Sequence, residues 1–586
     1  MDILQPVYTE KTECQDCYKC VRECPSKAIL VENNHAAIIP ELCVSCGHCV
    51  LVCPSKAKRV RDDLGRAKQL ISLGEKVVVS LAPSFKSEFH DTKPEQLISA
   101  IKKLGVWAVS ETAIGADIVS SYTAVQLQDS RKGNKTLQNG KQQKLFISSA
   151  CPAAVEYIKK YYPDYSAYIQ DCGSPLLSHC RFLKKNLGSE IKIIFIGPCI
   201  AKKREADSWE EIDLAISFSD LRRWFSEKNI MPALETPGDG ESFVPFNSAK
   251  GALYPIEGGM IESVNKYTGL EGVNTMAVSG LKNFEQVLAN LDNDNLSEPL
   301  FLEFLSCQGG CIAGPLGNQA DSTALKNLSI KKYAQNLPDT LNTGFDRIQA
   351  VLPVAQVQRE DFTEEQIQTA LRSVGKFSPA DEMNCGGCGY DTCRSFSKAM
   401  LAGRAEKSMC VSYMRKLAHK KANGLIRAIP SGAVIVDKNM GIIECNEIFA
   451  KLLGPEITAM YEAKPGLEGA DLSKIVPFYR FFQDVIFEEG LDLLEREVKE
   501  GNYTYHVTVF VIEKGESAGG VIQDITDPQM RKGRIVSQAR KVISKNLSVV
   551  QQIAFLLGEN AAETESILNS IIESFGGDFG NGDDDE

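Results

Sequence analysis

The sequence predicts a multidomain protein with an α/β core, small cysteine-rich domains on both sides of that core, and an α+β domain followed by a helix near the C-terminus. Three observations predict this organisation. A length of 586 residues exceeds what one hydrophobic core supports. Apolar runs alternate with helical patterns in the middle of the chain, and most of the 19 cysteines fall into regularly spaced groups.

The composition narrows the class of protein. A content of 43% hydrophobic and 24% charged residues is typical of globular proteins, and a net charge of -11 argues against nucleic-acid binding. The start of the chain does not resemble a signal peptide, and no apolar run is long enough to span a membrane. We therefore expect a cytoplasmic protein whose cysteines bind metal, because reducing cytosol disfavours disulfides.

Residues 1–70 contain two cysteine runs of the form C-x2-C-x2-C-x3-C-P. This spacing is that of a two-cluster ferredoxin domain, in which the fourth cysteine of each run binds the other cluster. A zinc site would use two C-x2-C pairs and would leave the third cysteine and the proline of each run without a role. The first 4Fe-4S cluster is assigned to Cys14, Cys17, Cys20 and Cys53, and the second to Cys24, Cys43, Cys46 and Cys49.

Residues 71–355 alternate between apolar runs and helical patterns, which predicts parallel strands joined by helices. Strands are expected at 76–83, 144–152, 191–199 and 300–307. Three of these runs end at a cysteine, namely Cys151, Cys199 and Cys307, and Cys311 follows one helical turn later. Because ligands collect beyond the carboxyl ends of parallel strands, we expect the four thiols to converge on one buried cluster.

The motifs around these cysteines resemble the three signatures of FeFe hydrogenases. SSACPAAVEYI (148–158) is similar to the first, GPCIAKKREAD (197–207) to the second, and EFLSCQGGCIAGP (303–315) to the third. The resemblance extends over about residues 1–350 and implies a core with parallel sheets and a cluster between strand ends. It implies that Cys151, Cys199, Cys307 and Cys311 hold the 4Fe-4S cubane of an H-cluster, and that Cys311 also bridges to a two-iron subsite carrying CO, cyanide and azadithiolate.

The resemblance also assigns roles to polar residues. Lys202 matches a lysine that donates a hydrogen bond to a cyanide ligand, although a surface lysine in a basic run is the alternative. Ser174 matches a serine of the family's proton path. Glu205 and Glu303 match acidic signature positions, and each could instead pair with a nearby lysine or arginine.

Several positions depart from the family pattern. Ala150 stands where catalytic members have a proton-carrying cysteine, and Thr123 and Gln126 stand about where two relay glutamates are expected. Gly197 and Leu305 replace methionines. Since a positioned proton donor typically contributes 10²–10⁴ in rate, the altered relay predicts low turnover.

Residues 360–420 contain a third group of spaced cysteines. The order C-x2-C-x4-C with a distant fourth thiol resembles a small 4Fe-4S domain of redox and corrinoid proteins, and structural zinc remains the alternative. A capping-box pattern at Thr363 and Gln366 predicts a short helix before this group. The expected ligands are Cys385, Cys388, Cys393 and Cys410.

Residues 425–530 resemble a PAS domain, with two strands joined by a turn at 438–441, a helix, and later strands of alternating pattern. His506 and Cys445 could ligate a cofactor, but packing roles are expected for both. Residues 531–575 carry a heptad-like apolar stripe that predicts a signalling and dimerisation helix, and hence a homodimer. Residues 576–586 are acidic and glycine-rich, which predicts disorder.

Together these features predict a sensory FeFe hydrogenase of an anaerobe, which binds and slowly turns over dihydrogen and passes its redox state through iron–sulfur clusters to the PAS domain. The expected partners are dihydrogen and protons, an electron carrier such as ferredoxin, hydrogenase maturation proteins, and a downstream kinase or phosphatase. No membrane or nucleic-acid partner is expected. The alternatives are a metabolic hydrogenase regulated by its PAS domain, and an electron-transfer or cluster-assembly protein that lacks the two-iron subsite.

Overall fold

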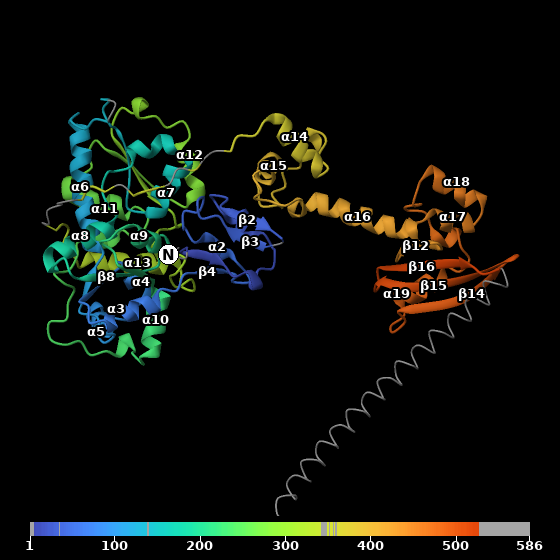
Figure 1. Ribbon diagram of the computed structural model, residues 1–586, viewed down its shortest axis with the longest axis horizontal. Coiled ribbons are helices and arrows are strands. Elements are labelled where there is room, and N and C mark those ends of the chain that lie inside the picture. Colours follow the sequence, from blue (N-terminus) through green and yellow to red (C-terminus); the bar gives the residue numbers. More distant parts are fainter. Residues whose placement is uncertain are drawn as a thin grey trace, which may run out of the picture. The chain divides into compact units, whose positions relative to one another are not determined.

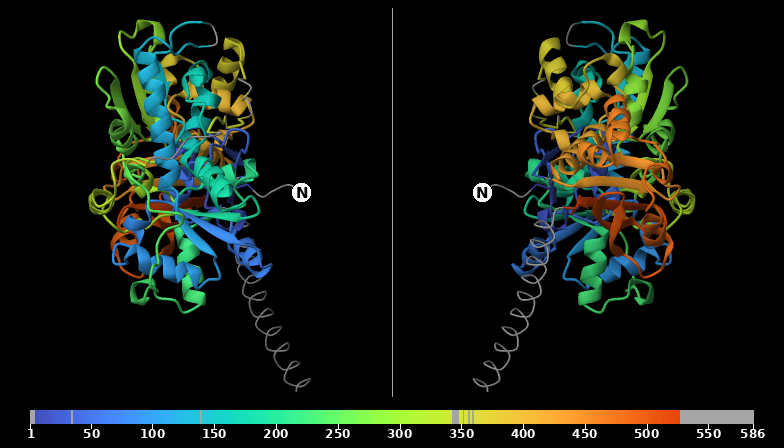
Figure 2. Two further views of the ribbon diagram at one scale, coloured as in Figure 1. Left: turned by 90° about the vertical axis from the view of Figure 1, so that its left-hand side faces the viewer. Right: turned by 90° about the vertical axis from the view of Figure 1, so that its right-hand side faces the viewer.

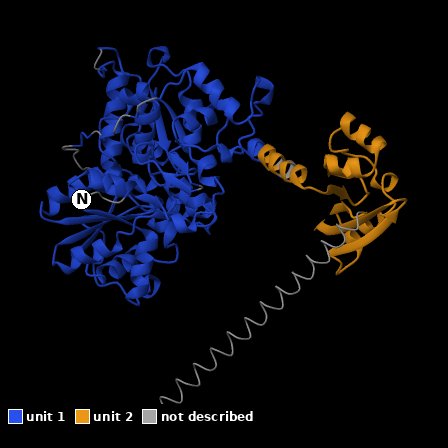
Figure 3. Ribbon diagram, turned by 45° about the vertical axis from the view of Figure 1, so that its right-hand side comes forward, with its two compact units in different colours: residues 1–414 blue, residues 415–586 orange. Residues whose placement is uncertain are grey.

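The computed structural model describes residues 5–526, apart from gaps at 34, 138–139, 342–347, 351, 355–356 and 358–359. The chain divides into two compact units, residues 1–414 and 415–586 (Figure 3). The dimerisation helix expected at 531–575 and the tail expected at 576–586 lie outside the described residues. Within the described part of the chain, no helix combines the length and apolar character needed to cross a bilayer.

The N-terminal domain consists of two similar halves, as the repeated cysteine runs predict. Strands β1 (Val7–Thr9) and β4 (Lys58–Val60) pair antiparallel, and so do β2 (Ile29–Glu32) and β3 (His35–Ile38). The third cysteine of each run lies in a short helix, α1 (Lys19–Glu23) or α2 (His48–Val52), and the fourth cysteine ends that helix. The two halves therefore present their cysteine loops in equivalent ways.

A four-stranded parallel sheet begins the α/β core (Figure 1). Its order is β6 (Ala108–Glu111), β5 (Val77–Leu81), β8 (Lys192–Gly197) and β9 (Leu214–Ser217). Its strands are apolar and buried, because helices cover a parallel sheet on both faces. The neighbouring helices are α3 (Leu64–Ser72), α4 (Phe85–Glu88), α5 (Pro94–Lys102), α8 (Pro175–Leu187), α9 (Ala201–Ser208) and α10 (Phe218–Glu227).

A second parallel sheet completes the core, with the order β10 (Asn274–Ser279), β11 (Leu300–Leu305) and β7 (Leu145–Ile147). All four strands expected from the sequence are present and parallel, but they are divided equally between the two sheets. Helix α6 (Ala113–Arg131), seen lengthwise in Figure 2, contacts both α8 and α11. The remaining helices of the core are α7 (Pro152–Tyr161), α11 (Gly259–Thr268), α12 (Phe284–Leu288) and α13 (Thr323–Gln335).

The third cysteine group lies in a small helical domain. Helix α14 (Glu364–Ser373) begins at the expected capping box, in which Thr363 and Gln366 bond each other's backbone N–H groups. Helix α15 (Cys393–Leu401) packs against α14. Helix α16 (Val411–Ala428) starts directly after Cys410 and leads into the second unit.

The second unit holds a five-stranded antiparallel sheet. Its order is β13 (Ile442–Cys445), β12 (Gly432–Asp437), β16 (Ser517–Asp524), β15 (Tyr503–Glu513) and β14 (Leu493–Glu500). Its helices are α17 (Glu447–Leu452), α18 (Pro455–Ala463) and α19 (Arg480–Phe487). Asn446 caps α17 and donates its amide to the carbonyl of Ile426 in α16 at 3.1 Å, which ties the incoming helix to the sheet.

Candidate metal centre

Four thiols of the α/β core come from three loops that follow strands. Cys151 caps the N-terminus of α7 after β7, Cys199 follows β8, and Cys307 follows β11. Cys311 begins a short 3-10 helix four residues later. All four thiols line one small enclosed cavity, although their strands belong to two different sheets.

The loop between Cys307 and Cys311 requires glycine. Gly310 has a φ of +95°, and a Cβ added there would lie 2.4 Å from the carbonyl oxygen of Pro255. A side chain would therefore meet both backbone strain and a steric clash. The amide of Ile312 donates to that same carbonyl at 3.2 Å, so the loop is fixed directly on the neighbouring segment.

A second cavity of about 90 Å³ adjoins the first and shares Cys151, Cys199 and Cys311 with it. Ala150 lines this cavity in place of the expected thiol. Lys202 lines it as well and is 8% exposed, so the alternative of a surface lysine does not hold. Apart from Lys202 and Glu303, the walls are predominantly apolar.

Lys202 is held by two polar neighbours. Its ammonium donates to Ser174 Oγ at 2.9 Å and to Glu205 Oε2 at 2.6 Å. Ser174 donates to Glu205 and also caps helix α8, accepting from the amide of Leu177. The lysine is therefore oriented by a carboxylate that carries the opposite charge and is itself 2% exposed.

The two positions where the resemblance places relay acids, Thr123 and Gln126, carry no carboxylate in this chain. Thr123 donates its hydroxyl to Gln170 Oε1 at 3.0 Å, and neither it nor Gln126 is an acid. A Cβ at Gly197 would lie 2.5 Å from the ring of Phe195, which lines the 90 Å³ cavity. Phe195 thus occupies the space that a methionine side chain at Gly197 would need, and the sequence alone did not reveal this packing.

The sequence identified Glu303 only as an acidic signature position, and the structure places it at the wall of this cavity. It is 1% exposed; Oε2 accepts from the amide of Ile261 at 3.1 Å, and Oε1 has no hydrogen-bond partner among the described residues. Burial raises its pKa from 4.5 to about 7. A carboxyl group that titrates near neutrality therefore faces the same space as Lys202 and Cys311.

Replacing Glu303 by glutamine is expected to flatten the pH dependence of stability in protein made without maturation proteins. Because folding raises the pKa of Glu303, its stabilising contribution is full below pH 4.5 and is lost as the pH rises through about 7. A shift of that size corresponds to roughly 3 kcal/mol, of which roughly 2 kcal/mol is lost between pH 5.5 and 8.5. Denaturation followed by tryptophan fluorescence at pH 5.5 and 8.5, values chosen to lie about 1.5 units on either side of 7, measures the difference. The exposed Glu262→Gln is the control, and a glutamine variant as pH-sensitive as wild type would contradict the assignment.

The core thiols suit a soft metal group. Burial, with a smaller contribution from Cys151, raises the pKa of Cys199 to about 11, and burial also raises the pKa of Cys307 and Cys311. Iron binds the thiolate form, so loading this site releases protons. Four half-buried thiols, an adjoining apolar cavity and a cation at its wall together fit an anionic iron–sulfur group with a second metal part.

Most thiols of the other cysteine groups have further thiols of the same predicted cluster as neighbours. Burial, partly opposed by Lys58, raises the pKa of Cys20 to about 11, and the nearby thiols of Cys14, Cys17 and Cys53 add to the rise. The thiol of Cys49 has Cys24, Cys43 and Cys46 as neighbours, and that of Cys388 has Cys385 and Cys410. Among the described residues, no three His, Cys, Asp or Glu side chains are arranged so that they could hold a single metal ion. The case for clusters therefore comes from cysteine spacing, neighbouring thiols and family matches.

One ferredoxin loop lies directly on the central site. Cys46 lines the same small cavity as Cys307 and Cys311. Lys160 and Arg204 of the core each donate to the carbonyl of Cys43 at 2.9 Å. The loop that carries Cys43 and Cys46 therefore lies beside the central thiols.

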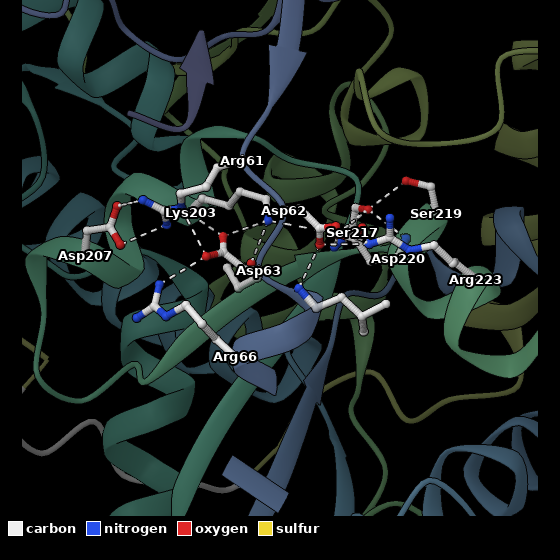
Figure 4. Close-up of polar contacts among 12 residues, drawn as sticks. Arg61, Asp62, Asp63, Arg66, Lys203, Asp207, Ser217, Ser219, Asp220 and Arg223 are labelled. Carbon is white, nitrogen blue, oxygen red and sulfur yellow. Dashed lines mark hydrogen bonds and ion pairs between the residues drawn. The ribbon is translucent and has the colours of Figure 1, made fainter. Parts of the chain in front are cut away.

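A buried ion network attaches the end of the ferredoxin domain to helix α9 (Figure 4). Asp63 accepts from Lys203 Nζ at 3.0 Å and pairs with Arg61 and Arg66, each also at 3.0 Å. Arg61 in turn pairs with Asp207 at 2.7 Å. Since Lys203 is the neighbour of Lys202, this network fixes the helix that carries the cavity's cation.

Comparisons with known proteins agree with this arrangement. The family model "Iron only hydrogenase large subunit, C-terminal domain" matches residues 75–315, "4Fe-4S dicluster domain" matches 6–54, and "Putative Fe-S cluster" matches 381–412. The Periplasmic Fe hydrogenase large subunit of Nitratidesulfovibrio vulgaris is 23% identical over an alignment of 374 residues. The match covers 53% of this chain and 86% of that protein.

Two solved structures are similar to parts of the chain. FeFe-hydrogenase HydA1 from Chlamydomonas reinhardtii is 18% identical with a TM-score of 0.39, covering 48% of this chain and 91% of that one. The PAS domain of an HTR-like protein from Haloarcula marismortui is 14% identical with a TM-score of 0.14, covering 19% of this chain and 99% of that one. Residues 75–315 therefore form an iron-only hydrogenase large-subunit domain, preceded by a 4Fe-4S dicluster domain and followed by a small iron–sulfur domain.

Proposed function

We propose that this protein is a sensory FeFe hydrogenase that binds dihydrogen, turns it over slowly, and reports the resulting redox state to its PAS-like domain. The observation that carries the proposal is Ala150 at the wall of the 90 Å³ cavity, where a thiol would be needed to carry protons. A methyl group neither accepts nor donates a proton. The attachment of a PAS-like unit through α16, which starts after Cys410, supports the signalling part.

The chain's own residues define what the site offers. When bound, a two-iron group with CO, cyanide and azadithiolate supplies the chemistry that splits or forms dihydrogen. Cys151, Cys199, Cys307 and Cys311 would hold the cubane, and Cys311 lines both cavities, as a bridging ligand must. Lys202 would donate a hydrogen bond to an anionic ligand, and the apolar walls would exclude bulk water.

The proposal extends to cofactors and partners. Ferredoxin-type clusters would reside in residues 1–70 and a further 4Fe-4S cluster on the cysteines of 385–410. The partners would be dihydrogen, protons, an electron carrier such as ferredoxin, the hydrogenase maturation proteins, and a downstream kinase or phosphatase. We further propose a cytoplasmic homodimer.

Infrared spectroscopy of protein produced with the maturation proteins tests the proposal first. Bands from iron-bound CO and cyanide are expected, and their absence from fully loaded protein would favour an electron-transfer or cluster-assembly role instead. Assays of dihydrogen oxidation and evolution come second. Rates well below those of metabolic hydrogenases are expected, and equally high rates would contradict a sensory role.

A metabolic hydrogenase remains the second candidate, and Glu303 is the observation that favours it. This carboxyl group faces the cavity, has no hydrogen-bond partner on Oε1 among the described residues, and has a pKa of about 7, so it is suited to exchange protons at neutral pH. A strong loss of turnover in Glu303→Gln, combined with high wild-type turnover, would identify this function.

Restoring the missing thiol is expected to raise turnover only modestly. In Ala150→Cys the new thiol would face the cavity. However, Thr123, which stands about where the family has a relay acid, donates its hydrogen bond to an amide oxygen and not to a carboxylate. We expect a gain below about tenfold, far short of the 10²–10⁴ that a complete relay supplies. Ala150→Ser is the control. A gain of 10² or more would show that Ala150 alone limited the rate.

A further inference from the structure

The small iron–sulfur domain shares one hydrophobic core with the ferredoxin domain. Val21 and Ile29 of the ferredoxin domain are buried in the same cluster of side chains as Tyr390, Phe396 and Met409. Cysteines of both domains take part, namely Cys20, Cys24, Cys388 and Cys410. Two cysteine groups more than 300 residues apart in the sequence therefore line a common interior.

Backbone contacts fix the orientation of this interface. The amide of Val31, in β2, donates to the carbonyl of Arg404 at 3.1 Å, and the amide of Asn33 donates to Glu406 Oε1 at 2.7 Å. Gly389 has a φ of +94°, and a Cβ there would lie 2.8 Å from Val21 Cγ1. The loop after Cys388 thus approaches α1 more closely than any residue with a side chain would allow.

Lys27 joins the two cysteine loops at this point. Its ammonium donates to the carbonyl of Gly389 at 2.8 Å, and to the carbonyls of Arg22 and Val21 at 3.2 and 3.4 Å. The nitrogen also lies 5.8 Å from the centre of the Tyr390 ring. Arg22 and Val21 lie between two ferredoxin cysteines, while Gly389 follows a cysteine of the other domain, so one positive charge is held by both loops.

The internal repeat of the ferredoxin domain provides a comparison for the role of Lys27. Lys27 and Lys56 occupy the same place in the two C-P-S-K-A segments, and both have a positive φ, of 48° and 57°. In each segment the lysine amide also donates to the carbonyl of the preceding cysteine. Lys56 is exposed, whereas Lys27 is half-buried against the second domain. Lysine therefore occupies the same local structure in both halves, but the Lys27 ammonium also donates to a carbonyl of the 385–410 domain.

We propose that Lys27 is a positioning residue that docks the 385–410 domain on the ferredoxin domain and places one positive charge beside the iron–sulfur groups of both. Clusters bound by thiolates are anionic, so a cation at their boundary favours the reduced, more negative form. The inference deepens the proposed function, because it names the contact between the ferredoxin domain and the segment that leads from Cys410 into α16. It depends on iron–sulfur clusters in both domains, but not on the two-iron subsite or on turnover.

The test uses the full chain, produced without maturation proteins so that its outcome is independent of hydrogenase activity. Redox titrations followed by electron paramagnetic resonance give the midpoint potential of each cluster. The signal that disappears in Cys388→Ser identifies the 385–410 cluster. Iron and sulfide analysis verifies that every other variant retains its clusters.

Lys27→Met is expected to lower the midpoint potential of the 385–410 cluster by about 59 mV, which corresponds to about a tenfold change in the equilibrium constant of a one-electron reduction. Lys27→Arg should restore the wild-type value. Lys56→Met should leave the potential of this cluster unchanged, because the Lys56 side chain is exposed, whereas that of Lys27 is half-buried. In reduced wild-type protein the ferredoxin signals should be broadened by the neighbouring spin and should narrow in Cys388→Ser. An unchanged 385–410 potential in fully loaded Lys27→Met, or an equal shift in Lys56→Met, would overturn the proposal. If the iron–sulfur interface holds but infrared bands are absent, only the proposed function fails.

Discussion

Replacing Cys311 by alanine is expected to remove every infrared band from iron-bound CO and cyanide and to reduce dihydrogen turnover to background. Cys311 lines both the small cavity of four thiols and the adjoining 90 Å³ cavity, so it is the thiol placed to hold the two parts of one group together. Loss of a single thiolate leaves an iron without its protein ligand. The measurement is infrared spectroscopy of matured protein, with iron content as a second readout.

Cys172→Ala is the matched control for this variant. Cys172 is 2% exposed and lies in the same core, where its thiol contacts Ser149 Oγ at 3.0 Å, but it does not line either cavity. Its removal should leave the bands in place. Signals of the ferredoxin clusters should persist in both variants, since their ligands are elsewhere. Retention of CO and cyanide bands in Cys311→Ala would show that another residue anchors the group.

Replacing Asp63 by asparagine is expected to destabilise the α/β core by about 3–5 kcal/mol, as removal of one partner from a buried ion network typically does. The carboxylate is 1% exposed and faces Lys203, Arg61 and Arg66. An amide would leave these cations without their shared counter-charge. Denaturation followed by tryptophan fluorescence reports this core, because all three tryptophans, Trp107, Trp209 and Trp224, belong to it.

The neighbouring Asp62→Asn provides the control. Asp62 pairs with Arg223 at the surface, where the two side chains are 58% and 47% exposed, and such pairs contribute about 0–1 kcal/mol. Burial alone would raise the pKa of Asp63, but Lys203 and Arg61 outweigh burial and hold that pKa below 3.8. The difference between wild type and Asp63→Asn should therefore be full at neutral pH and shrink as the pH falls below 3.8. Equal effects of the two substitutions would show that the network is not stabilising.

The fold was largely predictable wherever the signal is local in sequence. Cysteine spacing identified the ferredoxin halves, because the reach of a few residues dictates which thiols can share a cluster. The apolar runs identified β5, β7, β8 and β11, since strands buried on both faces must be apolar throughout. The capping box at Thr363 identified the start of α14 for the same reason, as its hydrogen bonds join residues three apart.

The sequence by itself thus determined the domain order, the strands that lead to Cys151, Cys199 and Cys307, and the absence of a thiol at Ala150. Only the tertiary structure decided that those strands divide between two sheets, that Glu303 faces the cavity, that Phe195 fills the space beside Gly197, and that the Lys27 ammonium bonds a carbonyl of the 385–410 domain. The physical reason is the range of the interactions. Spacing and periodicity act over one turn or one strand, whereas burial and charge depend on segments that are far apart along the chain and adjacent only after folding.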